Sequence, residues 1–277
     1  MHISIKQNLR KDRRAQAGLA VVALLFLFGI FSPWLAMDPH DFSNHIFASP
    51  GPGHWMGTND LGQDIFSRLL YGLRTSMFIS VSVGILATLI SVVVGMLAGF
   101  IGGWPDMVTM RVIDALLVLP SIIIIILVSA FIRPGLASLI IIISLFHWQG
   151  GARIIRGQTL AIKQKTHISC ARTFGAGKGY ILARHIFPDI GNIIVVSFLH
   201  NARSAVFLEA GMAFIGISSL ATVSLGTIMH NAFRFYYLPV WLWWLLPPGI
   251  MLALILLSFT FLGNLMEKVI DPRLRDA

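Results

Sequence analysis

The chain has 277 residues, of which 56% are hydrophobic and only 12% charged, and its formal net charge is +9. Its mean hydropathy is +0.79. A soluble domain is about 45–50% apolar and about 25% charged, so a single water-soluble core could not bury this chain. We therefore expect an all-α, polytopic membrane protein, and the positive charge is no sign of a nucleic-acid partner.

Six apolar segments predict about six transmembrane helices, since crossing about 30 Å of hydrocarbon takes about 20 residues. They are residues 17–36, 77–102, 110–132, 137–148, 190–217 and 239–266. The fourth is short and is expected to continue as a helix over residues 149–156. The second and fifth are long enough to tilt or to project beyond the bilayer. The basic start could also indicate a signal peptide, but five more spans follow, and we interpret residues 17–36 as a retained first helix.

Lysine and arginine gather in alternate connections between these spans. Sixteen of the 21 lie before the first span, beside the second–third connection, between the fourth and fifth spans, or after the sixth: Lys6, Arg10, Lys11, Arg13, Arg14, Arg111, Arg153, Arg156, Lys163, Lys165, Arg172, Lys178, Arg184, Lys268, Arg273 and Arg275. The positive-inside rule then predicts cytoplasmic tails at both ends, residues 1–16 and 267–277.

The connection between the first two spans is expected to be extracytoplasmic, so that residues 17–76 hold the first span and this segment. Its beginning is rich in proline and glycine and should be irregular. Its later part, residues 59–75, predicts an amphipathic helix lying at the membrane interface, with Ile65, Leu69 and Leu73 on one face. Residues 218–238 form the second extracytoplasmic connection.

The connection over about residues 149–189 is cytoplasmic and carries the most informative pattern. Residues 166–188 read THISCARTFGAGKGYILARHIFP. The pattern predicts a short helix that Gly175 ends in a left-handed cap. A second helix over residues 179–186 is expected to stop at a break that Pro188 forces before the fifth span. Two short helices joined at a glycine make a compact knob, which suits insertion into a groove of another protein.

This stretch resembles the EAA loop of the permease subunits of bacterial ABC importers. That loop has a glutamate-alanine-alanine core, a glycine after three more residues, and a proline thirteen residues after the glycine. The matching positions are Ser169, Cys170 and Ala171 with Arg172 after them, Gly175 at the glycine, and Arg184, His185 and Pro188 in the closing segment. The resemblance implies that the loop docks into the ATPase subunit and transmits its closure. Ser169 stands where the family has glutamate, and the alternative interpretation is an ordinary basic loop.

A second stretch narrows the resemblance. Residues 54–76 are similar to the H-x-L-G-T-D-x-L-G-R-D-x-x-S-R-L-x-Y-G-x-R-x-S signature of the dipeptide, oligopeptide and nickel importer permeases, second or C-type subunit. The signature segment contains Gly57, Thr58, Asp60, Gly62, Asp64, Arg68 and Arg74, and Gln63 replaces the usual arginine. The segments 110–120 and 271–274 are similar to the third-span entry and the C-terminal ending of the same family.

The resemblance implies a permease core over residues 77–266 in a bacterial or archaeal inner membrane. The implied partners are a second homologous permease, two ATP-binding subunits and an extracytoplasmic solute-binding protein. ATP and Mg would be bound by those subunits, because the chain has no G-x-x-x-x-G-K-[ST] motif, and no cofactor or catalytic residue is expected here. A secondary transporter or channel subunit is the alternative. The cargo stays open between peptides and nickel or metal chelates, with a slight preference for peptides.

Ionisable and polar residues inside the fifth span form a further candidate site. A charge there costs about 2.5–3.5 kcal/mol unless it faces protein or water. We expect His200, Asn201, Arg203 and Glu209 to face the translocation path or the partner permease, or else to be satisfied by contacts within the bundle. Arg203 and Glu209 are six residues apart, which argues against an ion pair within the helix.

Gly95, Gly99 and Gly103 form a G-x-x-x-G-x-x-x-G run that predicts close helix packing, either within the chain or at a subunit interface. Asp114 and Arg111 are expected to form a local pair. Cys170, the one cysteine, is interpreted as a small buried thiol and excludes an internal disulfide. The scattered histidines show no metal-ligand spacing, so no metal site is expected.

Overall fold

The structure is a computed structural model that describes residues 12–132, 135–217 and 222–270. Within these ranges it is helical and contains no strand, only two isolated bridges. Four helices are long and apolar enough to cross a membrane, and up to six spans result if each of two bent helix pairs is one span. The all-α polytopic fold is therefore confirmed. The basic residues before residue 12 and the C-terminal match at residues 271–274 lie outside the described residues.

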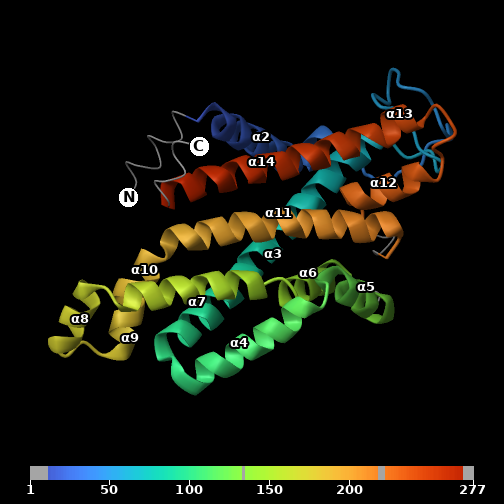
Figure 1. Ribbon diagram of the computed structural model, residues 1–277. Helices are drawn as coiled ribbons and strands as arrows, with labels where there is room; N and C mark the ends of the chain where they lie inside the picture. Colours follow the sequence, from blue (N-terminus) through green and yellow to red (C-terminus); the bar gives the residue numbers. More distant parts are fainter. Residues whose placement is uncertain (1–11, 133–134, 218–221, 271–277) are drawn as a thin grey trace.

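The helices follow the chain in this order: α2 (Arg13–Leu35), α3 (Ile65–Ile101), α4 (Gly103–Val118), α5 (Ser121–Ile132), α6 (Leu136–Leu145), α7 (Gln149–Lys163), α8 (Thr166–Thr173), α9 (Lys178–Ile181), the π-helical η1 (Leu182–Ile186), α10 (Phe187–Asp189), α11 (Gly191–Ile215), α12 (Leu225–Phe233), α13 (Trp241–Trp244) and α14 (Leu246–Ile270). Figure 1 shows α14, α11 and α7 side by side, with α3 crossing behind them. Helix α3 packs against α7, α11, α2 and α6, and is the central element of the bundle.

Helix α3 begins well before the second apolar segment. Asp64 caps it, because its side chain accepts a hydrogen bond from the Ser67 backbone N–H, and the helix then runs unbroken through 37 residues. The predicted interfacial helix over residues 59–75 is therefore wrong: its second half is the first part of α3. The predicted apolar face is confirmed, because Ile65, Leu69 and Leu73 are all buried.

The third and fourth predicted spans are both bent pairs of helices. α4 and α5 meet at 79°, and the break falls at Leu119 and Pro120. Proline has no N–H to continue a helix, which accounts for this break. α6 and α7 meet at 45° across residues 146–148, so the short fourth segment does continue as a helix, but after a bend.

The segment between α2 and α3 is irregular, as expected, and backbone constraints hold it. Gly57 and Gly62 have positive φ, and a Cβ on either would lie 2.1 Å from a carbonyl oxygen, of Ala48 and Ser43 respectively. The Thr58 hydroxyl donates to His45 O (2.5 Å). These three signature residues therefore shape the loop.

The charged signature residues lie at the start of α3. The Arg68 guanidinium is buried and donates to Gln63 Oε1 (2.6 Å) and to Pro39 O (3.1 Å). Gln63, the departure from the family pattern, thus accepts a bond from the arginine. Asp64 also contacts His54 Nδ1 (3.0 Å). By contrast, the side chain of Arg74 is exposed. Asp60 lies close enough to Arg68 to interact electrostatically with it.

The glycine run of α3 packs against α7 of the same chain. A Cβ on Gly95 would lie 2.4 Å from Ala152 O, and one on Gly99 would lie 2.8 Å from Arg156 O. Of the two alternatives, the structure shows packing within the chain at these positions. Gly103 does not take part: it has φ +64, no atom lies within 4 Å of its would-be Cβ, and with Gly102 it turns the chain into α4.

We predict that Gly95→Ala destabilises the protein, because the added methyl group meets the α7 backbone rather than a movable side chain. Overpacking of this kind costs about 1–3 kcal/mol. Thermal unfolding of the detergent-purified protein should show a lowered Tm. Gly263→Ala is the matched control, since nothing lies within 4 Å of its Cβ position. Equal Tm values for the two variants would contradict the packing role of Gly95.

Candidate functional site

A loop of short helices protrudes from one end of the bundle, on the left of Figure 1. It comprises α8, α9, η1 and α10, and we call it the protruding loop (residues 166–189). Its inward side chains Ile168, Ile181 and Ile186 are all buried. They join a hydrophobic cluster with Ile190, just before α11, and with residues of α3, α7 and α11: Val92, Phe100, Ile155, Ile162 and Ile193. A movement of the protruding loop would therefore act on side chains of α3, α7 and α11.

Gly175 forms the turn between α8 and α9, as predicted. Its φ is +83, in the left-handed region where glycine has no steric penalty. Its N–H donates to Arg172 O (2.9 Å), and the Ala176 N–H donates to Ala171 O (3.0 Å). Carbonyls at the end of α8 are thereby satisfied, and residues 174–177 connect α8 to α9.

The outward face of the protruding loop has no packing partner within the described residues. Ser169, Arg172 and Arg184 are exposed, and Phe174 is 90% exposed at the tip. The expectation of a buried thiol is wrong: Cys170 is exposed, because the inward positions of α8 are taken by Ile168 and not by its neighbours. An exposed phenylalanine next to a tight turn is a candidate contact for another protein.

The second half of the protruding loop differs from the prediction. Pro188 does not end the helix; it sits in the first turn of α10, where a missing N–H is tolerated. The chain passes from α9 through η1 into α10, and the break falls at Ile190. Within this half, His185 contacts the rings of His167 and Tyr180, at centroid distances of 6.0 and 5.7 Å.

Asp189 joins the two ends of the protruding loop. Its Oδ2 lies 3.0 Å from Lys165 Nζ, just before α8, and 3.9 Å from His167 Nε2. The loop is thus closed at its base and enters the membrane bundle as one unit.

A cavity of about 680 Å³ lies between the α4–α5 bend, the α6–α7 bend, α11 and α14. The polar side chains that line it are Ser121, His147, Gln149, Gln158, Ser197, His200, Asn201 and Glu267. Both bends that interrupt the apolar spans therefore open onto the same space. Polar side chains inside a membrane bundle mark a path for a hydrophilic solute.

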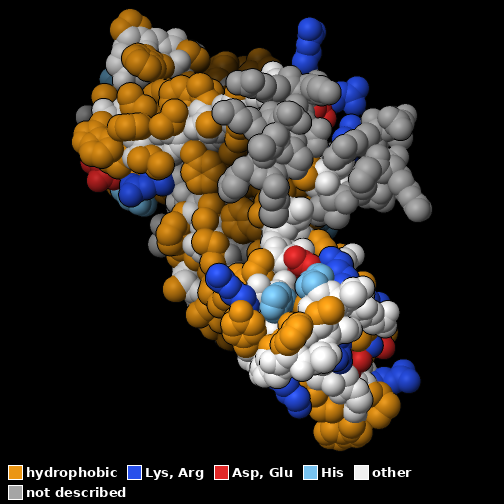
Figure 2. All heavy atoms as spheres, turned by 90° about the vertical axis from the view of Figure 1, so that its left-hand side faces the viewer, with side chains coloured by type: hydrophobic (Ala, Val, Ile, Leu, Met, Phe, Trp, Pro, Cys, Tyr) orange, Lys and Arg blue, Asp and Glu red, His pale blue; other side chains and the backbone are white. Residues whose placement is uncertain are grey.

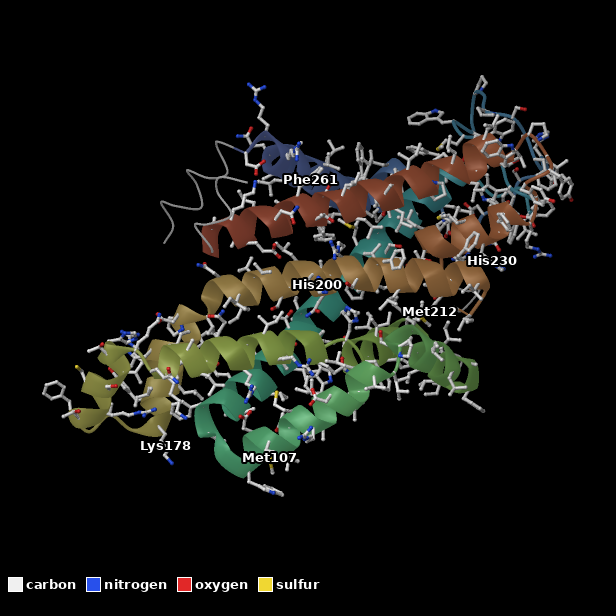
Figure 3. The ribbon with its side chains drawn as sticks, in the orientation of Figure 1. Met107, Lys178, His200, Met212, His230 and Phe261 are labelled. Carbon is white, nitrogen blue, oxygen red and sulfur yellow. The ribbon has the colours of Figure 1, made fainter. Side chains whose placement is uncertain are left out.

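Two histidines face each other across this cavity. The rings of His147 and His200 are parallel, with an interplanar angle of 8° and centroids 6.3 Å apart. Figure 3 shows His200 midway along α11, on the side of α7. His147 was not among the predicted path residues; its position at the end of the fourth apolar segment was the available signal. No group of three His, Cys, Asp or Glu suited to a metal occurs among the described residues.

The four residues predicted for the fifth span separate into different environments. His200 and Asn201 line the cavity, and Asn201 Nδ2 also donates to Thr88 Oγ1 on α3 (3.0 Å). Arg203 donates to Thr260 Oγ1 on α14 (3.2 Å) and does not line the cavity. Glu209 is 1% exposed within the bundle.

Glu209 lies where α12 meets α3 and α11. Its Oε2 is 3.4 Å from Ser76 Oγ, and the Leu225 N–H, at the start of α12, donates to the same Ser76 oxygen (3.2 Å). A Cβ on Gly226 would lie 2.7 Å from Ala210 Cα, so α12 and α11 are in backbone contact there. Glu209 therefore belongs to the contact that fixes α12.

Two arginines of α7 pair with carboxylates of α4. Arg156 donates to both oxygens of Asp106 (2.5 and 2.6 Å). Arg153, not Arg111, pairs with Asp114, so the predicted local pair of Asp114 and Arg111 is wrong. The sequence gives no local signal for the pair of Arg153 and Asp114, because the two residues are 39 positions apart.

The chain matches known families over most of its length. Residues 91–276 match the family described as binding-protein-dependent transport system inner membrane component, and residues 5–50 match the N-terminal transmembrane domain of oligopeptide transport permease C.

Curated relatives match almost the whole chain. The dipeptide transport system permease protein DppC of Bacillus subtilis is 32% identical over 97% of this chain and 85% of its own length. The oligopeptide transport system permease proteins OppC of Bacillus subtilis and Mycobacterium bovis are each 33% identical, over 97% and 98% of this chain and 88% and 94% of their own lengths. The chain belongs to the family of binding-protein-dependent transport system inner membrane components, the multi-pass permease subunits of ABC importers.

Proposed function

We propose that this permease subunit forms one half of a peptide translocation path and couples it to ATP hydrolysis in partner subunits. The observation that carries the proposal is the continuity of the structure. The exposed tip at Phe174 and Gly175 is followed along the chain by the buried Ile181 and Ile186 and then by the cavity-lining helix α11. The buried isoleucines of the protruding loop share one cluster with Ile193 of α11. Names of the relatives given above support peptides over nickel or metal chelates.

In this proposal two ATP-binding subunits dock at the protruding loop and supply ATP and Mg, a second homologous permease completes the path, and a solute-binding protein delivers cargo at the opposite end. The proposal also makes both tails, residues 1–16 and 267–277, cytoplasmic, which agrees with the distribution of lysine and arginine. Closure of the ATPases moves the loop and, through α11, opens the cavity to alternate sides. This chain itself performs no bond chemistry.

Phe174→Ala tests docking without disturbing the fold. The side chain is 90% exposed, so its loss should leave the Tm unchanged. As an aromatic anchor in the ATPase groove it should be worth 2 kcal/mol or more, about a thirtyfold loss in ATPase affinity. The measurement is recovery of ATPase with the tagged permease, together with ATP-driven peptide uptake in proteoliposomes. Phe131→Ala, 83% exposed on α5, is the control, and equal losses in both variants would contradict the docking role.

Gly175→Trp should uncouple transport while the chain stays in the membrane. A non-glycine residue at φ +83 costs about 1–2 kcal/mol of local strain, yet no atom lies within 4 Å to clash. ATP-driven uptake should be lost at normal membrane abundance. Gly177→Trp, with φ −67 and equally open surroundings, separates strain from bulk. Full uptake by the Gly175 variant would refute the coupling assignment.

His200→Ala tests the cavity as the path. We expect peptide uptake to fall several-fold at unchanged Tm, because the exposed ring lines the cavity and stacks on His147. Arg203→Gln is the comparison on the same helix: its guanidinium bonds to Thr260 outside the cavity, so uptake should stay near normal. The reverse order of effects would move the path to the Arg203 side of α11.

A further inference from the structure

A second pocket lies where the protruding loop joins the membrane bundle. It has a volume of about 450 Å³ and is formed by the ends of α3 and α7 together with α8, α9 and the turn between them. Its lining residues are Phe100, Ile101, Lys163, Arg172, Ala176, Lys178 and Ile181. Three of these are cations, and none of the described lining residues is a carboxylate. We call it the basic pocket.

One cation of the basic pocket is fixed in place. Lys163 Nζ donates to Phe100 O (2.6 Å) and lies 5.7 Å above the centre of the Phe100 ring. The acceptor is a carbonyl in the last turn of α3, where the helix itself leaves carbonyls without partners. Lys163 keeps two further N–H bonds with which it can bind a ligand.

The side chains of the other two cations have no partner in the described part of the chain. Arg172 and Lys178 are exposed, and neither side chain forms a hydrogen bond or ion pair with another described residue. Figure 3 shows Lys178 extending from α9 on the side of the α3–α4 turn. Figure 2 looks onto this end of the molecule and shows several Lys and Arg side chains on its surface. Three cations without a counter-charge at one pocket repel one another, and an anion would relieve that cost.

A neighbouring groove between α4 and α7 shows what an internally neutralised site looks like. It is also rich in arginine, but Asp106 pairs with Arg156 and Asp114 with Arg153. The basic pocket has no such carboxylates, so its charge is available to a ligand from outside.

Apolar surface beside the basic pocket identifies the kind of anion. Ile101 is 59% exposed at the end of α3, and Trp104 is 71% exposed three residues later. Tryptophan is typical of the membrane–water interface, and basic pockets at helix ends bind anionic lipid headgroups. Exposed apolar side chains give a free phosphate no benefit, whereas they can pack against acyl chains.

We propose that the basic pocket binds an anionic phospholipid, with Lys163, Arg172 and Lys178 around its phosphate and with its acyl chains along Ile101 and Trp104. The bound headgroup bridges the end of α3 and the two helices of the protruding loop, so it stiffens the joint between loop and bundle. Binding requires only that the chain spans a membrane, and it does not rest on the proposed import function.

The test measures lipid binding to the full-length chain, purified in mild detergent with every subunit that co-purifies. Native mass spectrometry follows titration with phosphatidylglycerol and, separately, with phosphatidylcholine. Arg172→Gln and Lys178→Gln should each weaken phosphatidylglycerol binding about fivefold, and together about 25-fold, without changing phosphatidylcholine binding. Lys165→Gln is the matched control: it lies before α8, its charge pairs with Asp189, and it does not line the pocket.

Two results would overturn the proposal. The first result is unchanged phosphatidylglycerol binding by the double variant. If that variant also loses its co-purifying ATPase, the pocket is a contact with another protein. Displacement of the lipid by inorganic phosphate at comparable concentration is the second, since it would identify a free-anion site. Both substituted side chains are exposed and contact no partner in residues 12–132, 135–217 and 222–270, so an unchanged Tm excludes unfolding as the cause. Neither result depends on transport, so the function proposed above stands or falls separately.

Discussion

The close approach of α3 and α7 is the contact on which the rest of the structure depends. Without a hydrophobic driving force between helices in lipid, association relies on packing, and Gly95 and Gly99 let the α7 backbone approach α3 directly. Because α7 leads into the protruding loop and borders the cavity at its other end, this contact positions both features. The Ser91 hydroxyl, which donates to Trp148 O (2.7 Å), ties the α6–α7 bend to the same helix.

The polar groups inside the bundle, on the backbone and on side chains, also depend on contacts within the protein. In hydrocarbon an unsatisfied polar group costs several kcal/mol, so bends survive only where protein or water covers them. The break at Pro120 and the bend at residues 146–148 both border the cavity, where water can reach the freed groups. The Ser76 hydroxyl donates to Glu209 and accepts from the first N–H of α12, so both groups have a partner. This allows a short helix to lie at one end of the bundle.

Local signals in the sequence predicted the local features well. The left-handed turn at Gly175 and the buried face of Ile65, Leu69 and Leu73 follow from spacing alone, and both are found. The early start of α3 was also readable, because Asp64 is a capping residue ahead of an apolar run, but the preceding breakers suggested a separate helix. Pairings such as Glu209 with Ser76, 133 residues apart, leave no local signal at all. The same holds for the division of His200 and Arg203 between cavity and bundle, since they lie three residues apart on one helix and nothing in the local sequence separates them.

The geometry of α11 explains how a small movement at one end can matter at the other. The helix starts one residue after Ile190, which is buried in the cluster beneath the protruding loop, and ends at Ile215, where Gly216 caps it with φ +89. Along its length it presents His200 to the cavity and Ala210 to the backbone of α12. A straight helix transmits displacement as a rigid rod, because its side-chain contacts are close-packed and do not deform continuously. A shift of the loop must therefore either move the cavity wall and α12 together or break one of these contacts.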